Sequence, residues 1–124
     1  MNNAPATGSP DPFQTLRDAL RQFAAERDWD QFHSPRNLAI ALNVEAAELL
    51  EHFQWLRDAE TGTIPPEKRA KVGEEIADVL LYLIRLADKL DIDLAIAATE
   101  KLKINAAKYP IHKARGNSKK YTEF

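Results

Sequence analysis

The chain has 124 residues, of which 44% are hydrophobic and 29% charged, and its formal net charge is −2 at pH 7. This length suits one domain with its own core, and the small net charge argues against a general nucleic acid binder. The absence of cysteine excludes disulfides, zinc-thiolate sites and thiol nucleophiles, and makes the cytoplasm the expected compartment. No apolar run is long enough to cross a bilayer, and the N-terminal residues lack the pattern of a secretory signal. We therefore expect neither a membrane nor a nucleic acid polymer as a partner.

The first half of the chain predicts two helices. Residues 1–11, rich in Asn, Ala, Gly, Ser and Pro, are expected to be a disordered segment. Apolar residues at helical spacing then predict a helix from Pro12 to near Trp29. A second helix begins at Ser34-Pro35, because serine is a common N-cap and proline suits the first helical position. We expect this helix to extend to about Leu56.

The second half predicts two more helices. The segment 58–66 is rich in Gly, Thr and Pro and is expected to be a turn, after which a third helix extends to about Leu90. The centre of that helix, ADVLLYLIRLA, is apolar on nearly all sides, so we expect it to be buried in a bundle or at a subunit interface. Asp91 or Asp93 can cap a fourth helix that ends before Tyr109. The predicted class is all-α.

The charges are unevenly distributed along the chain. The last 25 residues carry a net charge of +5, and the residues before them carry −7. An acidic body with a basic end could bind an anion through bridging metal ions, whereas a solvated basic tail is the more common meaning of such a charge run. We predict a helical domain over residues 12–110 and an irregular basic tail over residues 111–124.

Two pairs of carboxylates lie inside the most apolar stretches of the sequence. Glu45 and Glu48 belong to the second predicted helix, and Glu75 and Asp78 to the third. Residues three apart on a helix have neighbouring side chains, so each pair presents two carboxylates on one face. If the two helices pack antiparallel, the pairs can face each other and offer only oxygen ligands, which suit Mg²⁺. The pattern therefore favours a magnesium site.

Two other interpretations of these carboxylates were weighed. A Glu-x-x-Glu pair is common on exposed helices, so the spacing alone leaves a solvated helix face equally open. A ferritin-like iron site requires Glu-x-x-His on two helices, and neither pair has a histidine at that place. Iron oxidation chemistry is therefore not expected.

Aromatic and basic residues flank the acidic motifs. A base could stack on the flat side chains, although most buried aromatic residues serve packing; these residues are Trp29, Phe32, His33, Trp55 and Tyr82. One face of the fourth predicted helix carries two cations and an amide that could contact a phosphate and a sugar or base, namely Lys101, Asn105 and Lys108.

Together with the flanking sequence, these motifs resemble a known family. The spacing of the two carboxylate pairs is similar to the metal motif of the MazG-related all-α NTP pyrophosphohydrolases. Within that superfamily the resemblance is to the dCTP pyrophosphatase branch, through the strings FAAERDWDQFHSPRNL, FQW, EEIADVLLYL, KINAAKYP and KKYTEF. It extends from Phe13 to Phe124. One departure concerns the first helix, where some relatives have a histidine facing the base and this chain has Leu20.

The resemblance implies a four-to-five-helix bundle that assembles into a homotetramer, with active sites at subunit contacts. It implies Mg²⁺-dependent cleavage of a deoxynucleoside triphosphate, dCTP or a 5-modified dCTP, to the monophosphate and pyrophosphate, which clears unwanted nucleotides from the pool. The implied catalytic metal ligands are Glu45, Glu48, Glu75 and Asp78. The implied nucleoside pocket involves Trp29, Trp55 and Tyr82, and His33 and Tyr109 are further predicted substrate-binding residues. Lys101 and Asn105 are implied near sugar or phosphate, and the basic residues that could close over the triphosphate are Arg115, Lys119 and Lys120.

Two alternative functions stay open at this point. The same chemistry could act on dUTP or on non-standard purine triphosphates, because only the shape of the pocket separates these substrates. A different class is a helical interaction module without catalysis, whose acidic cluster binds a partner.

Overall fold

The computed structural model describes residues 11–124, and the regular structure of that part is helical throughout. The predicted all-α class is confirmed. The chain divides into two compact units, one ending at Asp91 and the other beginning at Ile92. The predicted disordered segment lies outside the described residues except for Asp11, and the predicted domain boundaries stay predictions. No helix within residues 11–124 combines the length and apolar character needed to cross a membrane.

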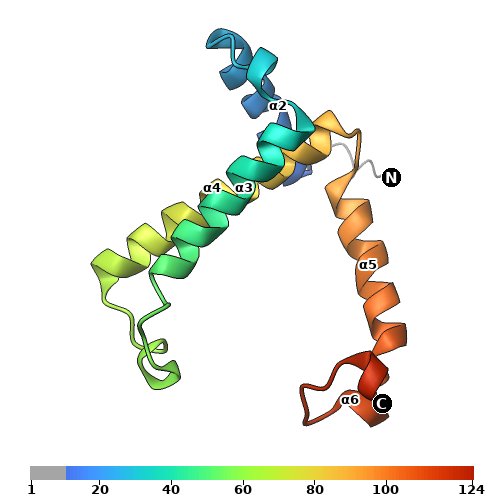
Figure 1. Ribbon diagram of the computed structural model, residues 1–124. Helices are drawn as coiled ribbons and strands as arrows, with labels where there is room; N and C mark the ends of the chain where they lie inside the picture. The colour runs from blue at the N-terminus through green and yellow to red at the C-terminus, as the bar shows by residue number, and fades with distance from the viewer. Residues whose placement is uncertain (1–10) are drawn as a thin grey trace, which may run out of the picture. The chain divides into compact units, whose positions relative to one another are not determined.

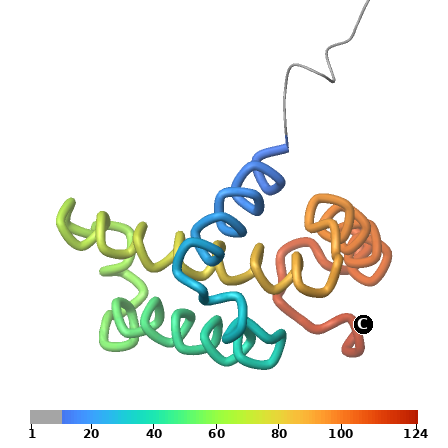
Figure 2. The backbone as a smooth tube through the Cα atoms, turned by 90° about the horizontal axis from the view of Figure 1, so that it is seen from above, coloured from blue at the N-terminus to red at the C-terminus, as the bar shows by residue number. Residues whose placement is uncertain are grey.

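The first unit contains the helices α2 (Pro12–Glu26), α3 (Pro35–Glu51) and α4 (Pro66–Lys89). Helices α3 and α4 run side by side in opposite directions, as Figures 1 and 2 show, and α2 crosses and packs against α4. The short 3₁₀ turns η1 (Asp30–Phe32) and η2 (Asp58–Glu60) lie in the connections. The antiparallel arrangement of α3 and α4 lets residues near their middles face one another.

Side-chain caps define the starts of α2 and α3. The Oδ1 atom of Asp11 accepts a hydrogen bond from the backbone N–H of Phe13 at 2.9 Å. The Oγ atom of Ser34 accepts one from Asn37 at 3.1 Å, so the predicted N-cap of the second helix is confirmed. Each cap satisfies an N–H group that has no partner within the first helical turn.

The predicted end of the second helix was wrong. Helix α3 ends at Glu51 rather than near Leu56. Beyond it the chain forms tight turns, in which the backbone N–H groups of both Phe53 and Gln54 bond to the carbonyl of Leu50 at 2.8 and 2.9 Å. Two N–H groups converging on one carbonyl tighten the last turn and end the regular ladder, which the apolar spacing alone does not reveal.

The buried core of the first unit is small. Its buried apolar residues are Ala24, Leu38, Val72, Ile84 and Ala87. Several large apolar side chains on the same helices stay exposed, including Ile40 at 49% and Ile76 at 53%. The apolar centre of α4 is also only partly covered, since Leu83 within it is 39% exposed.

The second unit contains α5 (Leu94–Lys108), α6 (Ile111–Ala114) and the 3₁₀ turn η3 (Tyr121–Glu123). Asp93 caps α5 through a 3.0 Å bond from the N–H of Ile96, which confirms one of the two predicted caps. The segment predicted as a basic tail includes the short elements α6 and η3. Tyr109 makes edge-on contacts with Tyr121 and Phe124 at centroid distances of 6.0 and 5.8 Å.

Candidate active site

Three carboxylates meet between α3 and α4. Glu45 and Glu48 lie one turn apart on α3, and Glu75 faces them from α4. One carboxylate oxygen from each residue lies within 4.8 Å of those of the other two. All three residues are half-buried. The helical spacing places the α3 pair on one face, and the antiparallel packing brings the α4 residue opposite to it.

Ionisation of the carboxyl groups in this acidic cluster is unfavourable in the absence of a cation. Burial raises the pKa of Glu45 to about 7, and the adjacent carboxyl of Glu48 acts in the same direction. Burial and the charge of Glu48 also raise the pKa of Glu75. The Oε2 atoms of Glu45 and Glu75 are buried and have no hydrogen-bond partner in the described protein. Converging carboxylates with unpaired buried oxygens fit a hard divalent cation, because it neutralises their charge and accepts oxygen ligands.

Asp78 lies between this cluster and a neighbouring cavity. It is exposed and stands one turn beyond Glu75 on α4, outside the group of three converging carboxylates. Its charge raises the pKa of both Glu45 and Glu75, and it also lines the cavity. Asp78 is therefore a residue of the cavity wall whose charge also acts on the acidic cluster.

The cavity has a volume of about 410 Å³, within the range of roughly 300–1,000 Å³ typical of small-molecule sites. Its wall is formed by α2, α4 and the connection after α2, through Leu16, Ala19, Leu20, Phe23, Ala24, Trp29, His33, Asp78, Leu81, Tyr82 and Arg85. Trp29 packs edge-on against Phe23 at 5.7 Å and against His33 at 6.4 Å between ring centroids. The pKa of Tyr82 is raised by burial and by nearby carboxylates. Three of the predicted aromatic residues, Trp29, His33 and Tyr82, thus come together.

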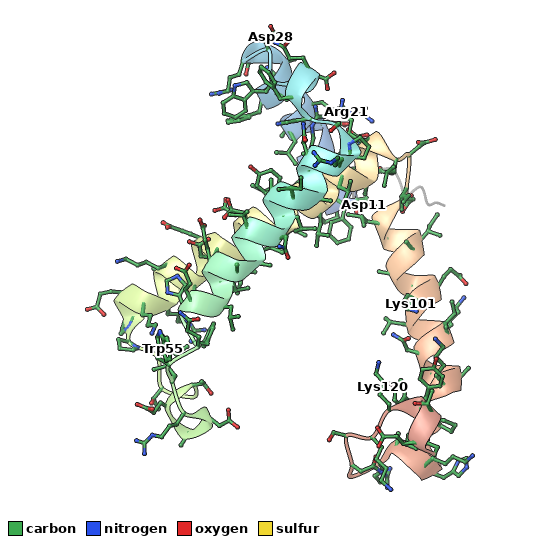
Figure 3. All side chains as sticks on the ribbon, viewed as in Figure 1. Asp11, Arg21, Asp28, Trp55, Lys101 and Lys120 are labelled. Atoms are coloured by element: carbon green, nitrogen blue, oxygen red, sulfur yellow. The ribbon has the colours of Figure 1, made fainter. Side chains whose placement is uncertain are left out.

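Trp55 does not join them. It lies in the connection between α3 and α4, is 86% exposed, and is absent from the cavity wall (Figure 3). Trp55 is close to Glu45 and Glu48 in residue number only, because α3 has already ended at Glu51.

The remaining predicted residues belong to the second unit. Lys101 and Asn105 lie one turn apart on α5, and both are exposed; Figure 3 labels Lys101 there. Tyr109 packs in the aromatic contact described above, and the exposed basic residues that follow it are Arg115, Lys119 and Lys120.

The sequence analysis missed Arg85, a cavity residue that is only 5% exposed. A signal for it exists in the sequence. Asp78, Tyr82 and Arg85 follow each other at spacings of four and three residues, so they share one face of α4. Arg85 is a single cation in an apolar run, and it shares a helix face with a carboxylate and a tyrosine. Because charged residues are rarely buried without partners, this pattern indicates a polar site inside a core.

Comparison with known proteins identifies the family. The sequence pattern of the MazG-like family matches residues 40–124. The chain belongs to the MazG-like family. It is 50% identical over 125 residues to human dCTP pyrophosphatase 1, covering 97% of this chain and 74% of the human protein. The mouse protein of the same name is 49% identical over 93% of this chain and 69% of its own length.

A solved structure gives the same result for the fold of this MazG-like chain. The crystal structure of a pyrophosphatase from Archaeoglobus fulgidus superposes with a TM-score of 0.77 at 41% sequence identity. The match covers 82% of this chain and 95% of the archaeal chain. The predicted resemblance to the dCTP pyrophosphatase branch is confirmed by these relatives.

Proposed function

We propose that this chain is a Mg²⁺-dependent pyrophosphohydrolase that cleaves dCTP, or a 5-modified dCTP, to the monophosphate and pyrophosphate. The observation that carries the proposal is that Asp78 lines the aromatic cavity while its charge acts on Glu45 and Glu75 of the acidic cluster. A triphosphate bound to cations at the cluster extends its base toward an apolar, aromatic-lined space. The names of the human and mouse relatives support the choice of dCTP.

In this proposal the four carboxylates Glu45, Glu48, Glu75 and Asp78 hold the metal. A bound divalent cation neutralises phosphate charge and favours ionisation of a water molecule. Displacement at a phosphorus atom depends on alignment and charge neutralisation more than on a protein nucleophile.

The base-binding role falls to the aromatic residues of the cavity. Trp29 and Tyr82 offer ring faces and edges for contact with a pyrimidine, and the apolar side chains of α2 close the other wall. The residues of the second unit, Lys101, Asn105, Tyr109, Arg115, Lys119 and Lys120, are proposed to contact sugar and phosphates. Trp55 is proposed to complete the pocket of another copy, which accounts for its exposure of 86% in a single chain.

We also propose that the chain works as a homotetramer. Large apolar side chains on both units stay exposed, for example Ile76 at 53%, Ile96 at 62% and Leu102 at 70%. Burial of such side chains between copies is strongly favourable in water. Sedimentation equilibrium should give the mass of a tetramer, and Leu102→Lys should reduce it. A monomeric native protein that keeps full activity would contradict this part of the proposal.

The experiment that tests the function is a substrate panel. The purified protein is incubated with dCTP, dUTP, dTTP and ATP, with Mg²⁺ and with a chelator, and the products are identified by chromatography. The proposal predicts dCMP and pyrophosphate from dCTP, in the presence of Mg²⁺ only. Faster turnover of dUTP or a purine triphosphate would replace the substrate while keeping the chemistry. No turnover across the panel would favour the interaction module instead.

A further inference from the structure

Arg85 is a buried charged residue in the core of the first unit, and its side chain is fully engaged. Its Nε atom donates to Nδ1 of His33 at 3.1 Å, and its Nη2 atom donates to Oδ1 of Asp30 at 2.7 Å. Its Nη1 atom lies 3.6 Å from Oδ2 of Asp88. A buried guanidinium needs such partners, because an unpaired charge in the core is strongly destabilising. Two of these partners are carboxylates, so the histidine is the exceptional one.

The contact between Arg85 and His33 determines the state of the imidazole. A guanidinium has only donors and keeps its charge in proteins, so Nδ1 of His33 must be the acceptor and must carry a lone pair. The ring is then neutral, and its proton resides on Nε2. Because His33 also lines the cavity, Nε2–H is the polar group of the ring left for a bound molecule.

The charges around His33 act in the same direction. Burial lowers its pKa, and the cations of Arg85 and Lys89 on α4 lower it further, while Asp30 on η1 opposes them. Asp30 has already accepted hydrogen bonds from both cations. The neutral ring is therefore favoured near physiological pH.

We propose that Arg85 is a positioning residue, which holds His33 in the cavity wall as the Nε2-protonated imidazole and so presents an N–H donor to an acceptor atom of the bound base. This inference rests on the proposed function, because it assumes that the cavity binds a nucleobase. Cytosine offers acceptors at N3 and O2. Replacement of Arg85 frees Nδ1 to take the proton instead, and the donor at Nε2 is lost in part of the molecules.

The first test is two-bond ¹H–¹⁵N NMR of the imidazole rings in the full-length, substrate-free protein, where nitrogens with and without a proton give distinct signals. The sequence has three histidines, so single substitution of His52 and His112 assigns the spectrum. We expect His33 to be protonated on Nε2 only. In Arg85→Met we expect a mixture of tautomers and a higher pKa of His33. A wild-type His33 with its proton on Nδ1 would overturn the proposal.

Arg85→Met keeps much of the side-chain volume, and the two carboxylates retain other partners, since Lys89 still contacts Asp30 and Arg21 still contacts Asp88. The matched control is Arg21→Met, which removes a partner of Asp88 without touching His33. We expect the spectrum of His33 to be unchanged in the control. Equal changes in both variants would mean that the network is only structural.

The second test is kinetic, with dCTP and Mg²⁺. In Arg85→Met we expect KM to rise by the inverse of the fraction of His33 that keeps its proton on Nε2, with little change in kcat. His33→Phe removes the donor from all molecules, so it should raise KM roughly tenfold, as for the loss of one hydrogen bond in a protected site. The double variant should be no worse than His33→Phe alone, because the first substitution acts only through the same donor. Additive effects of the two substitutions would overturn the proposal.

The two proposals fail in different ways. If the wild-type protein hydrolyses no nucleotide, the proposed function falls, whereas the NMR test of Arg85 and His33 needs no substrate. If dCTP is hydrolysed and the KM of Arg85→Met is unchanged, the positioning role falls and the proposed function stands.

Discussion

Glu45 on α3 and Glu75 on α4 each bury an Oε2 atom that has no hydrogen-bond partner in the described protein, and both belong to one cluster of carboxylates. Two unpaired acceptors from facing helices are unfavourable unless a positive charge joins them. This arrangement raises the free energy of the metal-free protein and favours cation binding. Metal affinity and stability should therefore be coupled at this site.

Glu45→Gln tests that coupling. It replaces a buried carboxylate by a neutral amide that can donate to Glu48 or Glu75, so the Tm of the metal-free protein at pH 8 should rise. The increase in Tm on adding Mg²⁺ should disappear, and turnover should fall by roughly two orders of magnitude, the loss typical of removing a group that stabilises transition-state charge.

The control is Glu74→Gln, which removes an exposed carboxylate from the neighbouring position. We expect its Mg²⁺ response and turnover to stay close to wild type. An undiminished Mg²⁺ response in Glu45→Gln, measured by differential scanning calorimetry, would exclude Glu45 as a ligand.

The pH dependence of stability follows from Glu45. Its pKa is about 7 in the folded protein, against 4.5 for a free glutamate carboxyl. The folded state thus holds this proton more tightly than the unfolded chain. The resulting stabilisation is complete below pH 4.5 and is lost as the pH rises through 7.

Comparison with Glu45→Gln isolates this effect, because Asp88, whose pKa is lowered by Arg21, and His33 contribute equally to both proteins. Without metal, the Tm of the wild type should fall relative to the variant between pH 5 and pH 8, the window that contains the shift of Glu45. A constant difference in Tm over this range would show that Glu45 titrates normally.

Leu38 is the largest fully buried side chain of the described core, with 1% exposure. Leu38→Ala should lower the free energy of unfolding by about 3 kcal/mol, through lost burial and the cavity that it leaves. Leu50→Ala on the same helix, at a position 58% exposed, is the matched control and should change it less. Urea denaturation measures both. A loss below about 1 kcal/mol for Leu38→Ala would mean that the core is not packed as described.

Trp29 is expected to act in the active site of its own chain, and Trp55 in that of another copy. Trp29 lies in the cavity of its own chain, so Trp29→Ala should raise KM for dCTP at every protein concentration. Trp55 is exposed and is proposed to act in another copy, so co-expression of Trp55→Ala with Glu75→Gln should restore part of the activity that each variant lacks. Complementation is read from turnover of the mixed oligomer against each variant alone. Absence of any restored activity would contradict a role of Trp55 in the active site of another copy.

Much of the fold follows from local sequence signals. The caps at Ser34 and Asp93 act on neighbouring residues, so their effect on helix starts can be predicted from a few positions. The end of α3 at Glu51 depends on two N–H groups that share one carbonyl, and no residue type in that segment signals this. Helix starts were therefore predicted more accurately than this helix end.

The acidic cluster could be predicted for a similar reason. The spacing of Glu45 and Glu48 is local, and the antiparallel packing of α3 and α4 brings Glu75 opposite to them. The contact of Arg85 with His33 could not be predicted from the sequence. It joins residues 52 positions apart, and their relative position depends on how η1 docks on α4. Nor could the exposure of Trp55, which depends on where the turns after α3 direct it.

The most direct test of the proposed reaction is hydrolysis of dCTP by the wild-type protein in H₂¹⁸O with Mg²⁺, followed by mass spectrometry of the products. We expect dCMP and pyrophosphate, with one ¹⁸O atom in dCMP, because the proposed reaction is attack of water on the α-phosphorus. Glu75→Gln should give neither product at a comparable rate. Release of dCDP and phosphate, or ¹⁸O found in pyrophosphate, would contradict the proposed reaction.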